Sequence, residues 1–231
     1  MTDRVTLPWP DPAPFMSRDG RPIRLLAVSD EVDPSLDSER TRSVVEPVDA
    51  VIGCGDLEPD YLAFVADAFR APLAYVRGNH DVGRGWTAGR DLLPEPLADG
   101  RVRDEQGLRL LAFSGSPNYS GQGRPDTDQQ VSEFAMWRHV LGAWPGAARR
   151  RPVLLVTHAA PRDLNDAPDQ AHRGFAAYRW LLDRLQPPLW LHGHTALVQR
   201  GLSGRCLRHE GTMLVNVTGS VLVELTPPEA A

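Results

Sequence analysis

Residues 72–81 read PLAYVRGNHD, a short apolar run followed directly by an asparagine, a histidine and an aspartate. An apolar run that ends on an aspartate or a histidine occurs in four further stretches: IRLLAVSD (23–30), VDAVIGCGD (48–56), PVLLVTH (152–158) and PLWLHGH (188–194). Continuous apolar runs of this length, bounded by turn residues, are typical of strands that are buried on both faces. The five runs therefore predict the strands of a sheet that is at least partly parallel.

Segments with helical signals separate these strands. Pro59 is expected to be the first residue of a helix, a position where proline is common. Other segments show helical spacing of apolar residues or a capping residue. The expected helices cover residues 36–46, 59–70, 129–144 and 174–185. Strands that alternate with helices predict an α/β fold.

The two ends of the chain differ from this alternating part. Residues 1–22 are rich in proline and polar residues and are expected to form an irregular arm. The consecutive strand-like runs near the C-terminus predict a second, antiparallel part. Residues 101–115 are expected to form a hairpin that turns near Gln106 and Gly107. No repeat or linker interrupts the rest, so residues 23–231 are assigned to one domain.

The composition excludes several classes of protein. All 25 basic residues are arginine, and a P-loop or a Schiff-base enzyme needs a lysine. Cys54 and Cys206 are too few for a zinc finger or a disulfide framework. The net charge of −5 argues against a long nucleic-acid footprint, which requires clustered positive charge.

Membrane and export signals are not expected either. No apolar run approaches the length of about 18 residues that a membrane-spanning helix needs. Residues 1–15 contain acids and four prolines, whereas a secretory signal begins with basic residues and continues with an apolar stretch. The expected location is therefore the cytoplasm, with no membrane partner.

The residues after the strands are potential metal ligands. They are Asp30, Asp56, Asn79, His158 and His194. Because ligands of open α/β sheets bind at the carboxyl ends of the strands, these residues are expected to meet at one edge. Carboxylate, amide and imidazole donors suit Mn²⁺, Fe or Zn²⁺ better than Mg²⁺ or Ca²⁺. Any one of them alone has a simpler interpretation as a turn residue, but five such residues at five strand ends favour a metal site.

The ordered set of motifs resembles the calcineurin-like metallophosphoesterases. The blocks that carry the resemblance are VSD (28–30), GCGD (53–56), GNHD (78–81), VTHAAP (156–161) and HGHT (192–195). The resemblance covers roughly residues 23–220 and implies a four-layer sandwich, with two mixed β-sheets flanked by helices. It also implies a site with two metals that are bridged by an aspartate and by a water or hydroxide.

The resemblance assigns a role to each matching residue. Asp56 corresponds to the bridging carboxylate. Asn79, His158 and His194 correspond to the other ligands of the second metal, and Asp30 corresponds to a ligand of the first metal. His80 resembles the family histidine beside the phosphoryl oxygen or the leaving group, although a structural histidine bonded to Asp81 is the simpler alternative. Asp81 itself is expected to support the site rather than to react.

Both departures from the family pattern fall on the first metal position. Val32 stands where the family's first block has a histidine, and Ala196 stands where its last block has one. The first metal is therefore expected to be weakened, replaced or absent, with one tight site remaining. Glu31 or Asp33 is a candidate for an additional oxygen ligand, and Glu31 is the weaker of the two because neighbouring side chains of an extended strand point apart.

Other residues near the motifs have two interpretations each. DQAHRGF (169–175) resembles a block from a bacterial branch of the family that also lacks the first-block histidine, which makes His172 a catalytic candidate or a loop residue. His192 either orients a ligand or is a core histidine. Tyr119 and Arg124 are candidates for contact with a substrate phosphate, and they lie in a loop long enough to act as a lid.

Taken together, the residues predict an enzyme, a metal-dependent hydrolase of small phosphate esters. A metal-bound hydroxide would attack phosphorus, and His80 would help the leaving group to depart. Mn²⁺ is the preferred cofactor, with Fe, Zn²⁺ and Mg²⁺ as alternatives, and a phosphodiester is the preferred substrate. The alternative function, favoured by Val32 and Ala196, is a degenerate member that binds a metal, a phosphate ligand or a protein with little turnover.

Overall fold

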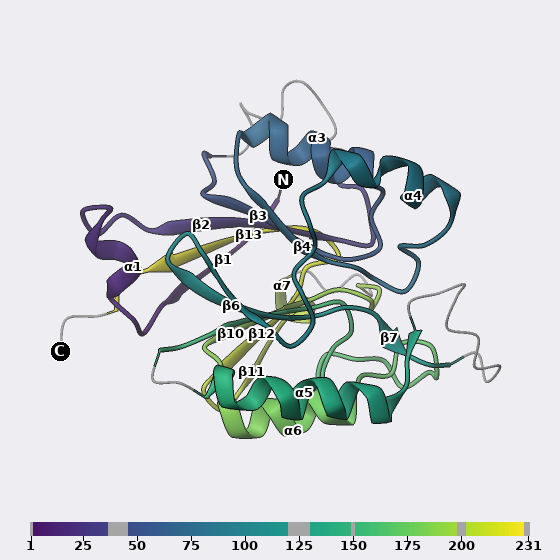
Figure 1. The fold of residues 1–231 in the computed structure, drawn as a ribbon. Coiled ribbons are helices and arrows are strands. Elements are labelled where there is room, and N and C mark those ends of the chain that lie inside the picture. The colour runs from purple at the N-terminus through teal and green to yellow at the C-terminus, as the bar shows by residue number, and fades with distance from the viewer. Residues whose placement is uncertain (1, 37–45, 120–129, 149–150, 198–201, 229–231) are drawn as a thin grey trace.

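A computed structural model describes residues 2–36, 46–119, 130–148, 151–197 and 202–228. Most of the predicted helix over 36–46 and Arg124 lie outside these described residues. Two large sheets lie face to face with helices on their outer sides (Figure 1). This arrangement confirms the predicted α/β class and the four-layer sandwich with two mixed β-sheets.

The first sheet joins the two ends of the chain to three strands from its first half. The strand order is β1 (Asp3–Pro8), β13 (Gly219–Thr226), β2 (Ile23–Ser29), β3 (Ala50–Cys54) and β4 (Leu73–Val76). Strands β2, β3 and β4 are parallel to one another, and β13 is antiparallel to β2.

The second sheet is parallel in its centre and antiparallel at both edges. Its order is β11 (Cys206–His209), β12 (Thr212–Asn216), β10 (Leu189–His192), β9 (Leu154–Thr157), β6 (Leu108–Phe113) and β5 (Val102–Glu105). A small parallel pair, β7 (Ser116–Pro117) and β8 (Gln130–Val131), lies outside it. The predicted hairpin is confirmed, because β5 and β6 pair across Gln106 and Gly107, which both have positive φ.

Helices cover the outer face of each sheet. They are α3 (Pro59–Phe69) and α4 (Arg84–Gly89) on the first sheet, and α5 (Glu133–Ala147) and α6 (Ala176–Leu185) on the second. Shorter helical pieces are α1 (Ala13–Met16), α7 (Leu202–Arg205) and η1 (Arg90–Leu92). The helix predicted over 129–144 begins later, because Ser132 caps it by accepting a hydrogen bond from the main-chain N–H of Ala135.

Alternation along the strands builds separate cores on the two faces of each sheet. Leu25 and Ala27 of β2 face the opposite sheet, whereas Leu26 and Val28 pack in the core beneath α3. Because both faces of the parallel strands are covered, their sequences are continuously apolar. This apolar pattern stops at the strand ends. The polar residues that follow the strands lie at the same edge of both sheets.

The prediction of an irregular arm over residues 1–22 is wrong for residues 3–8 and 13–16. Residues 3–8 form β1, which pairs in parallel with β13, and α1 follows. Val5, Leu7 and Trp9 are buried, with Trp9 only 1% exposed. Their spacing of two is a strand pattern, but the surrounding prolines concealed it, and its partner strand lies at the far end of the chain.

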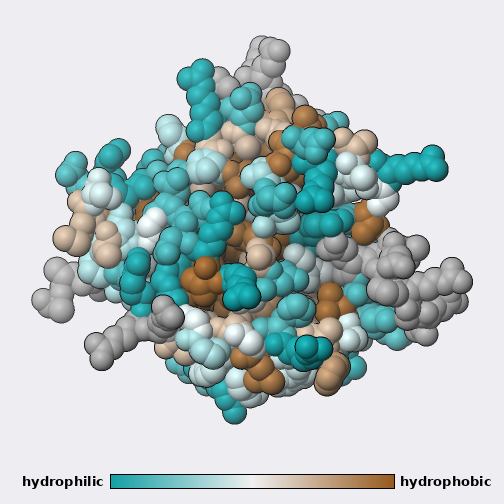
Figure 2. Space-filling view, viewed as in Figure 1, coloured by the Kyte–Doolittle hydropathy of each residue, from teal (hydrophilic) through white to brown (hydrophobic). Residues whose placement is uncertain are grey.

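The face of the molecule drawn in Figure 2 carries mostly polar side chains. Figure 2 shows a hydrophilic face on which apolar residues occur at scattered positions, as is ordinary for folded proteins. Among the described residues, no helix has both the length and the apolar character needed to cross a membrane.

Candidate metal centre

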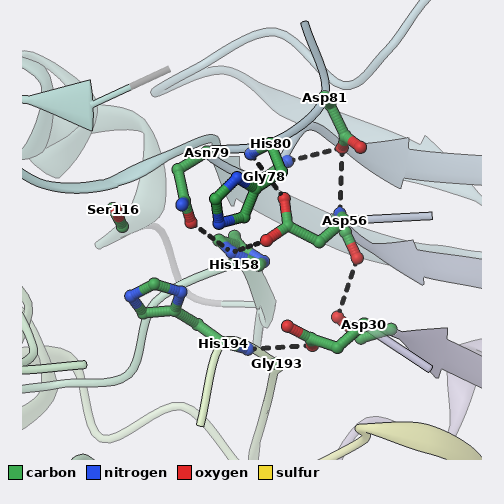
Figure 3. A network of polar contacts seen from close by, with 12 residues as sticks. Asp30, Asp56, Gly78, Asn79, His80, Asp81, Ser116, His158, Gly193 and His194 are labelled. Carbon is green, nitrogen blue, oxygen red and sulfur yellow. Dashed lines mark hydrogen bonds and ion pairs between the residues drawn. The ribbon is translucent and has the colours of Figure 1, made fainter. Parts of the chain in front are cut away.

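The candidate centre lies where parallel strands of both sheets end. Asp30 follows β2, Asp56 follows β3 and Asn79 follows β4, all in the first sheet. His158 follows β9 and His194 follows β10, both in the second sheet. Figure 3 shows that the five side chains gather in one place, as the sequence predicts.

Three of these residues form a ligand cluster. One donor atom each from Asp56, His158 and His194 lies within 4.8 Å of the other two. His158 Nε2 is 3.2 Å from Asp56 Oδ2 and 2.9 Å from Asn79 Oδ1, so Asn79 adjoins the same point. His158 is fully buried and His194 is 7% exposed, so water does not compete for most of this donor set.

Main-chain carbonyls orient both imidazoles of the ligand cluster. His158 Nδ1 lies 2.8 Å from the carbonyl oxygen of Cys54, and His194 Nε2 lies 2.8 Å from that of Ala171. A carbonyl only accepts hydrogen bonds, so each of these nitrogens carries the proton. The other nitrogen of each ring, Nε2 of His158 and Nδ1 of His194, is thereby left for a metal.

Burial and neighbouring charges shift the pKa values of both imidazoles of the ligand cluster. Burial alone opposes a charge on His158, but the hydrogen bond and the charge of Asp56 outweigh burial and raise its pKa to about 9. Burial, together with the nearby charge of His158, lowers the pKa of His194 to about 3. His194 is therefore neutral, and the proton on His158 Nε2 lies between carboxylate and amide oxygens, where a metal would replace it.

The turns that carry the ligands have unusual backbone conformations. Asp30, Asp56 and His194 have φ angles of 60°, 56° and 66°, in the left-handed region that costs free energy for residues other than glycine. A Cβ atom at Gly55 or Gly78 would overlap with neighbouring atoms, including the Asp56 side chain in the case of Gly78. The chain therefore accepts local strain and needs glycine at two positions in order to bring these side chains together.

Asp81 supports the turn that carries Asp56. Its Oδ2 accepts hydrogen bonds from the main-chain N–H groups of Asp56, at 3.0 Å, and Gly78, at 2.6 Å. Asp81 is 2% exposed, and burial raises its pKa to about 6. These contacts agree with the predicted supporting role, and they show that its carboxylate binds main-chain groups of the two loops.

The position of the family's first metal has fewer donor side chains than the ligand cluster. Asp30 is not part of the ligand cluster, and Val32, which is 49% exposed, contributes no donor atom. Neither candidate for a replacement oxygen joins the cluster. Asp33 instead accepts hydrogen bonds from Ser35 N and Ser220 Oγ, and Glu31 is exposed.

Two further histidines flank the cluster. His80 is exposed, and its main-chain N–H donates to Asp56 Oδ1 at 2.8 Å. The ring of His172 lies 5.2 Å from the ring of His194, and its Nδ1 is 2.8 Å from Asp169 Oδ1. Both predicted catalytic histidines therefore stand at the edge of the candidate centre.

Other residues near the centre also have defined partners. His192 is fully buried; its Nδ1 lies 3.0 Å from the carbonyl oxygen of Gly193 and its Nε2 lies 3.3 Å from Asn165 Nδ2. These contacts favour the interpretation of His192 as a core histidine, whose pKa burial lowers to about 4. Tyr119 reaches the site, since Asn79 Nδ2 donates to its hydroxyl at 3.4 Å.

Sequence reasoning missed the groups that orient the ligands. The carbonyl oxygens of Cys54 and Ala171 leave no trace in the side-chain pattern, because every residue has a carbonyl. The side chain of Thr218, whose Oγ1 lies 3.4 Å from Asp30 Oδ2, was also missed. Thr218 lies just beyond the end of β12, much as the predicted ligands follow their strands, and this position is the signal that could have identified it.

The two facing sheets, together with ligands at the shared strand edge, define a metallophosphoesterase fold. The family model for calcineurin-like phosphoesterases matches residues 28–197. The chain therefore belongs to the calcineurin-like phosphoesterase family, as the sequence motifs predict.

Solved structures show the same fold at low sequence identity. The crystal structure of TT1561 from Thermus thermophilus has a TM-score of 0.60 and 14% identity, and the match covers 86% of this chain and 90% of that one. A second crystal structure has a TM-score of 0.60 and 13% identity, with 86% and 91% of the two chains covered. Among curated proteins, the sequence search found no match.

Proposed function

We propose that this protein hydrolyses small phosphate esters, preferably phosphodiesters, with one tightly held divalent metal as cofactor. Membership of the calcineurin-like phosphoesterase family supports a metal-dependent phosphoester hydrolase. The single observation that carries the proposal is the ligand cluster of Asp56, His158 and His194, with donor atoms within 4.8 Å of one another. Asn79 is the fourth proposed ligand.

The donor set fits a divalent ion of the first transition series. One carboxylate, one amide oxygen and two imidazoles match Mn²⁺, Fe or Zn²⁺, and we propose Mn²⁺ with Mg²⁺ as the weakest alternative. A metal bound there would lower the pKa of a water molecule, so that it can attack phosphorus, and would screen the charge of the phosphoryl oxygens. The carbonyls of Cys54 and Ala171 hold the two rings ready for it.

The flanking histidines are proposed to handle the proton of the leaving group. A leaving alkoxide needs a proton donor within hydrogen-bond reach, and His80 and His172 border the ligand cluster. Nδ1 of His172 donates to Asp169 Oδ1, so Nε2 would donate a proton to the leaving group from the imidazolium form of the ring. Tyr119, which lies against Asn79, is placed to contact a phosphoryl oxygen.

The substrate class follows from charge. A phosphodiester carries less negative charge than a phosphomonoester, so a centre with one divalent ion neutralises it more completely. The chain has a net charge of −5, which disfavours long polyanions. A small diester in the cytoplasm is therefore the proposed substrate.

A specific observation favours a second candidate function. The first metal position has Val32 and Ala196 in place of histidines, and an enzyme that needs both metals would lose its activity there. In this candidate function the protein binds a metal or a phosphate ligand with little turnover. The two functions differ in turnover, not in whether the metal binds.

Hydrolysis of bis(p-nitrophenyl) phosphate with added Mn²⁺ tests the proposal, with p-nitrophenyl phosphate as the monoester comparison. We expect the diester to react faster, and His158→Ala to reduce the rate to that of the buffer. His139→Ala, on the exposed side of α5, is the matched control and should keep the wild-type rate. A wild-type rate equal to that of His158→Ala would favour the second function.

The two flanking histidines need a test that separates proton donation from binding. Removing a proton donor slows esters with poor leaving groups more than esters of p-nitrophenol, because only the former need a proton to depart. We therefore compare His80→Ala and His172→Ala on phenyl and p-nitrophenyl diesters. An equal loss on both esters would exclude that histidine as the proton donor.

A further inference from the structure

We infer that Asp30 is a positioning residue, which fixes the turn of His194 across the two sheets, and that the centre consequently holds one divalent ion per chain. This inference rests on the proposed function, since it concerns the same metal centre. It assigns Asp30 a role that differs from the one implied by the family resemblance, in which this residue binds a first metal.

Asp30 forms hydrogen bonds to two neighbouring loops, those of His194 and Gly55. Its Oδ2 accepts a hydrogen bond of 2.9 Å from the main-chain N–H of His194, and its own N–H donates to the carbonyl oxygen of Gly55 at 3.2 Å. Thr218 Oγ1 lies 3.4 Å from the same Oδ2. Asp30 follows β2 of the first sheet and His194 follows β10 of the second, so this hydrogen bond joins the two layers at the centre (Figure 3).

The packing around Gly193 leaves no space for a side chain. A Cβ atom at Gly193 would overlap with Ser29 Oγ and Asp30 Oδ2, so the turn presses directly on the end of β2. Gly193 also donates its main-chain N–H to the carbonyl oxygen of His158 at 2.9 Å. The His194 turn is therefore held from both sides, by Asp30 and by the loop that carries the other imidazole.

The position that a first metal would occupy has few donors. Val32 has no donor atom and is half exposed, and Ala196 is exposed. Asp33 directs its carboxylate to Ser35 and Ser220. Oδ2 of Asp30 accepts hydrogen bonds from His194 and Thr218. This position therefore offers fewer protein donors than the cluster of two imidazoles, a carboxylate and an amide.

On the other side of the centre, Asp81 also accepts a hydrogen bond from the main chain of a proposed ligand. Asp81 accepts the main-chain N–H of Asp56, and Asp30 accepts that of His194. Both receiving ligands have left-handed φ angles, and a strained turn persists only when its surroundings hold it in place. Each strained ligand turn therefore has its own carboxylate support.

Metal counting tests the inference with a readout that does not depend on activity. Purified wild type, Asp30→Asn and Asp30→Ala are saturated with Mn²⁺ and freed of unbound ion, and then Mn²⁺ per chain is measured together with the electron paramagnetic resonance spectrum. Calorimetric titration gives the dissociation constant, and circular dichroism confirms folding. Glu31→Gln, an adjacent exposed carboxylate, is the matched control for the change in charge.

We expect one Mn²⁺ per chain in all four proteins, with the spectrum of an isolated ion. Asp30→Asn should bind Mn²⁺ within a few-fold of wild type, because an amide oxygen still accepts the hydrogen bond from His194. Asp30→Ala should bind about 10–100-fold more weakly, the typical cost of removing a group that orients a ligand. Glu31→Gln should equal wild type.

Three results would overturn the inference. Two Mn²⁺ per wild-type chain with a coupled-pair spectrum, and one after substitution of Asp30, would make this residue a metal ligand. The proposed hydrolysis of phosphate esters would stand, but with two metals. Unchanged affinity in Asp30→Ala would remove the positioning role. Should Asp30→Ala fail to fold, the wild-type count and the Asp30→Asn titration still decide. Absence of any Mn²⁺ in wild type would overturn the proposed function as well.

Discussion

The two positions of the candidate centre lie at the same strand edge but differ in their donors. Around Asp56, two buried imidazoles and the amide of Asn79 converge, and two carbonyls orient the rings. Around Asp30, the corresponding sites carry Val32 and Ala196. The strand ends that carry both positions are present, whereas only one position keeps its imidazoles, so the fold of this edge does not depend on the donors that it carries.

The largest effect is expected from breaking the position that keeps its donors. Asp56→Ala should weaken Mn²⁺ binding by more than about 100-fold, because the loss of a ligand exceeds the loss of a group that only orients one. Diester hydrolysis should fall to the rate of the buffer. Calorimetric titration and the p-nitrophenolate assay measure the two effects.

The matched control for Asp56→Ala is Asp60→Ala, an exposed aspartate near the start of α3, which should behave as wild type. Full activity in Asp56→Ala would show that the cluster is not the catalytic centre. The cluster and the position of Asp30 would then not differ in their importance for activity.

A smaller effect is expected from the support of the same position. Asp81→Ala removes the acceptor for the main-chain N–H groups of Asp56 and Gly78, and should weaken Mn²⁺ binding by about 10–100-fold. Asp81→Asn keeps an acceptor oxygen and should lose less. If both variants bind Mn²⁺ as wild type does, the hydrogen bonds of Asp81 are not needed to position Asp56.

The smallest effect is expected from rebuilding the depleted position. Val32→His combined with Ala196→His restores two imidazoles at exposed sites and should add a second, weaker Mn²⁺ binding event to the calorimetric titration. A gain of about tenfold in affinity there corresponds to about 1.4 kcal/mol. The double variant with glutamine at both sites controls for side-chain size, and an unchanged titration would contradict our assignment of these positions.

Most of the fold could be predicted because its signals are local. Apolar runs predicted β2, β3, β4, β9 and β10, and Pro59 marked the start of α3. β1 could not be recognised, because residues 3–8 are flanked by prolines and their pairing with β13 is a long-range contact that no local pattern reveals. Long-range pairing of this kind overrides local composition.

The site could be predicted as far as side chains define it. Asp56, His158 and His194 were expected at one sheet edge and form the ligand cluster. The hydrogen bond from His194 to Asp30 could not be foreseen, because it depends on main-chain geometry and on the approach of two sheets. Asp56 and Asp30 both follow strands, yet Asp56 lies in the ligand cluster and Asp30 accepts a main-chain hydrogen bond. Only distances in the structure distinguish these two positions.

The position of β13 has a consequence for how the chain assembles. β13 lies between β1 and β2 in the first sheet, so Asp3 pairs with Val221, and β2 gains its second neighbour only from the last strand. Closing so long a loop before the contacts form is slow. During synthesis, the first sheet therefore stays incomplete until residues 219–226 have left the ribosome, and until then the edge of β2 is open to pairing with other chains.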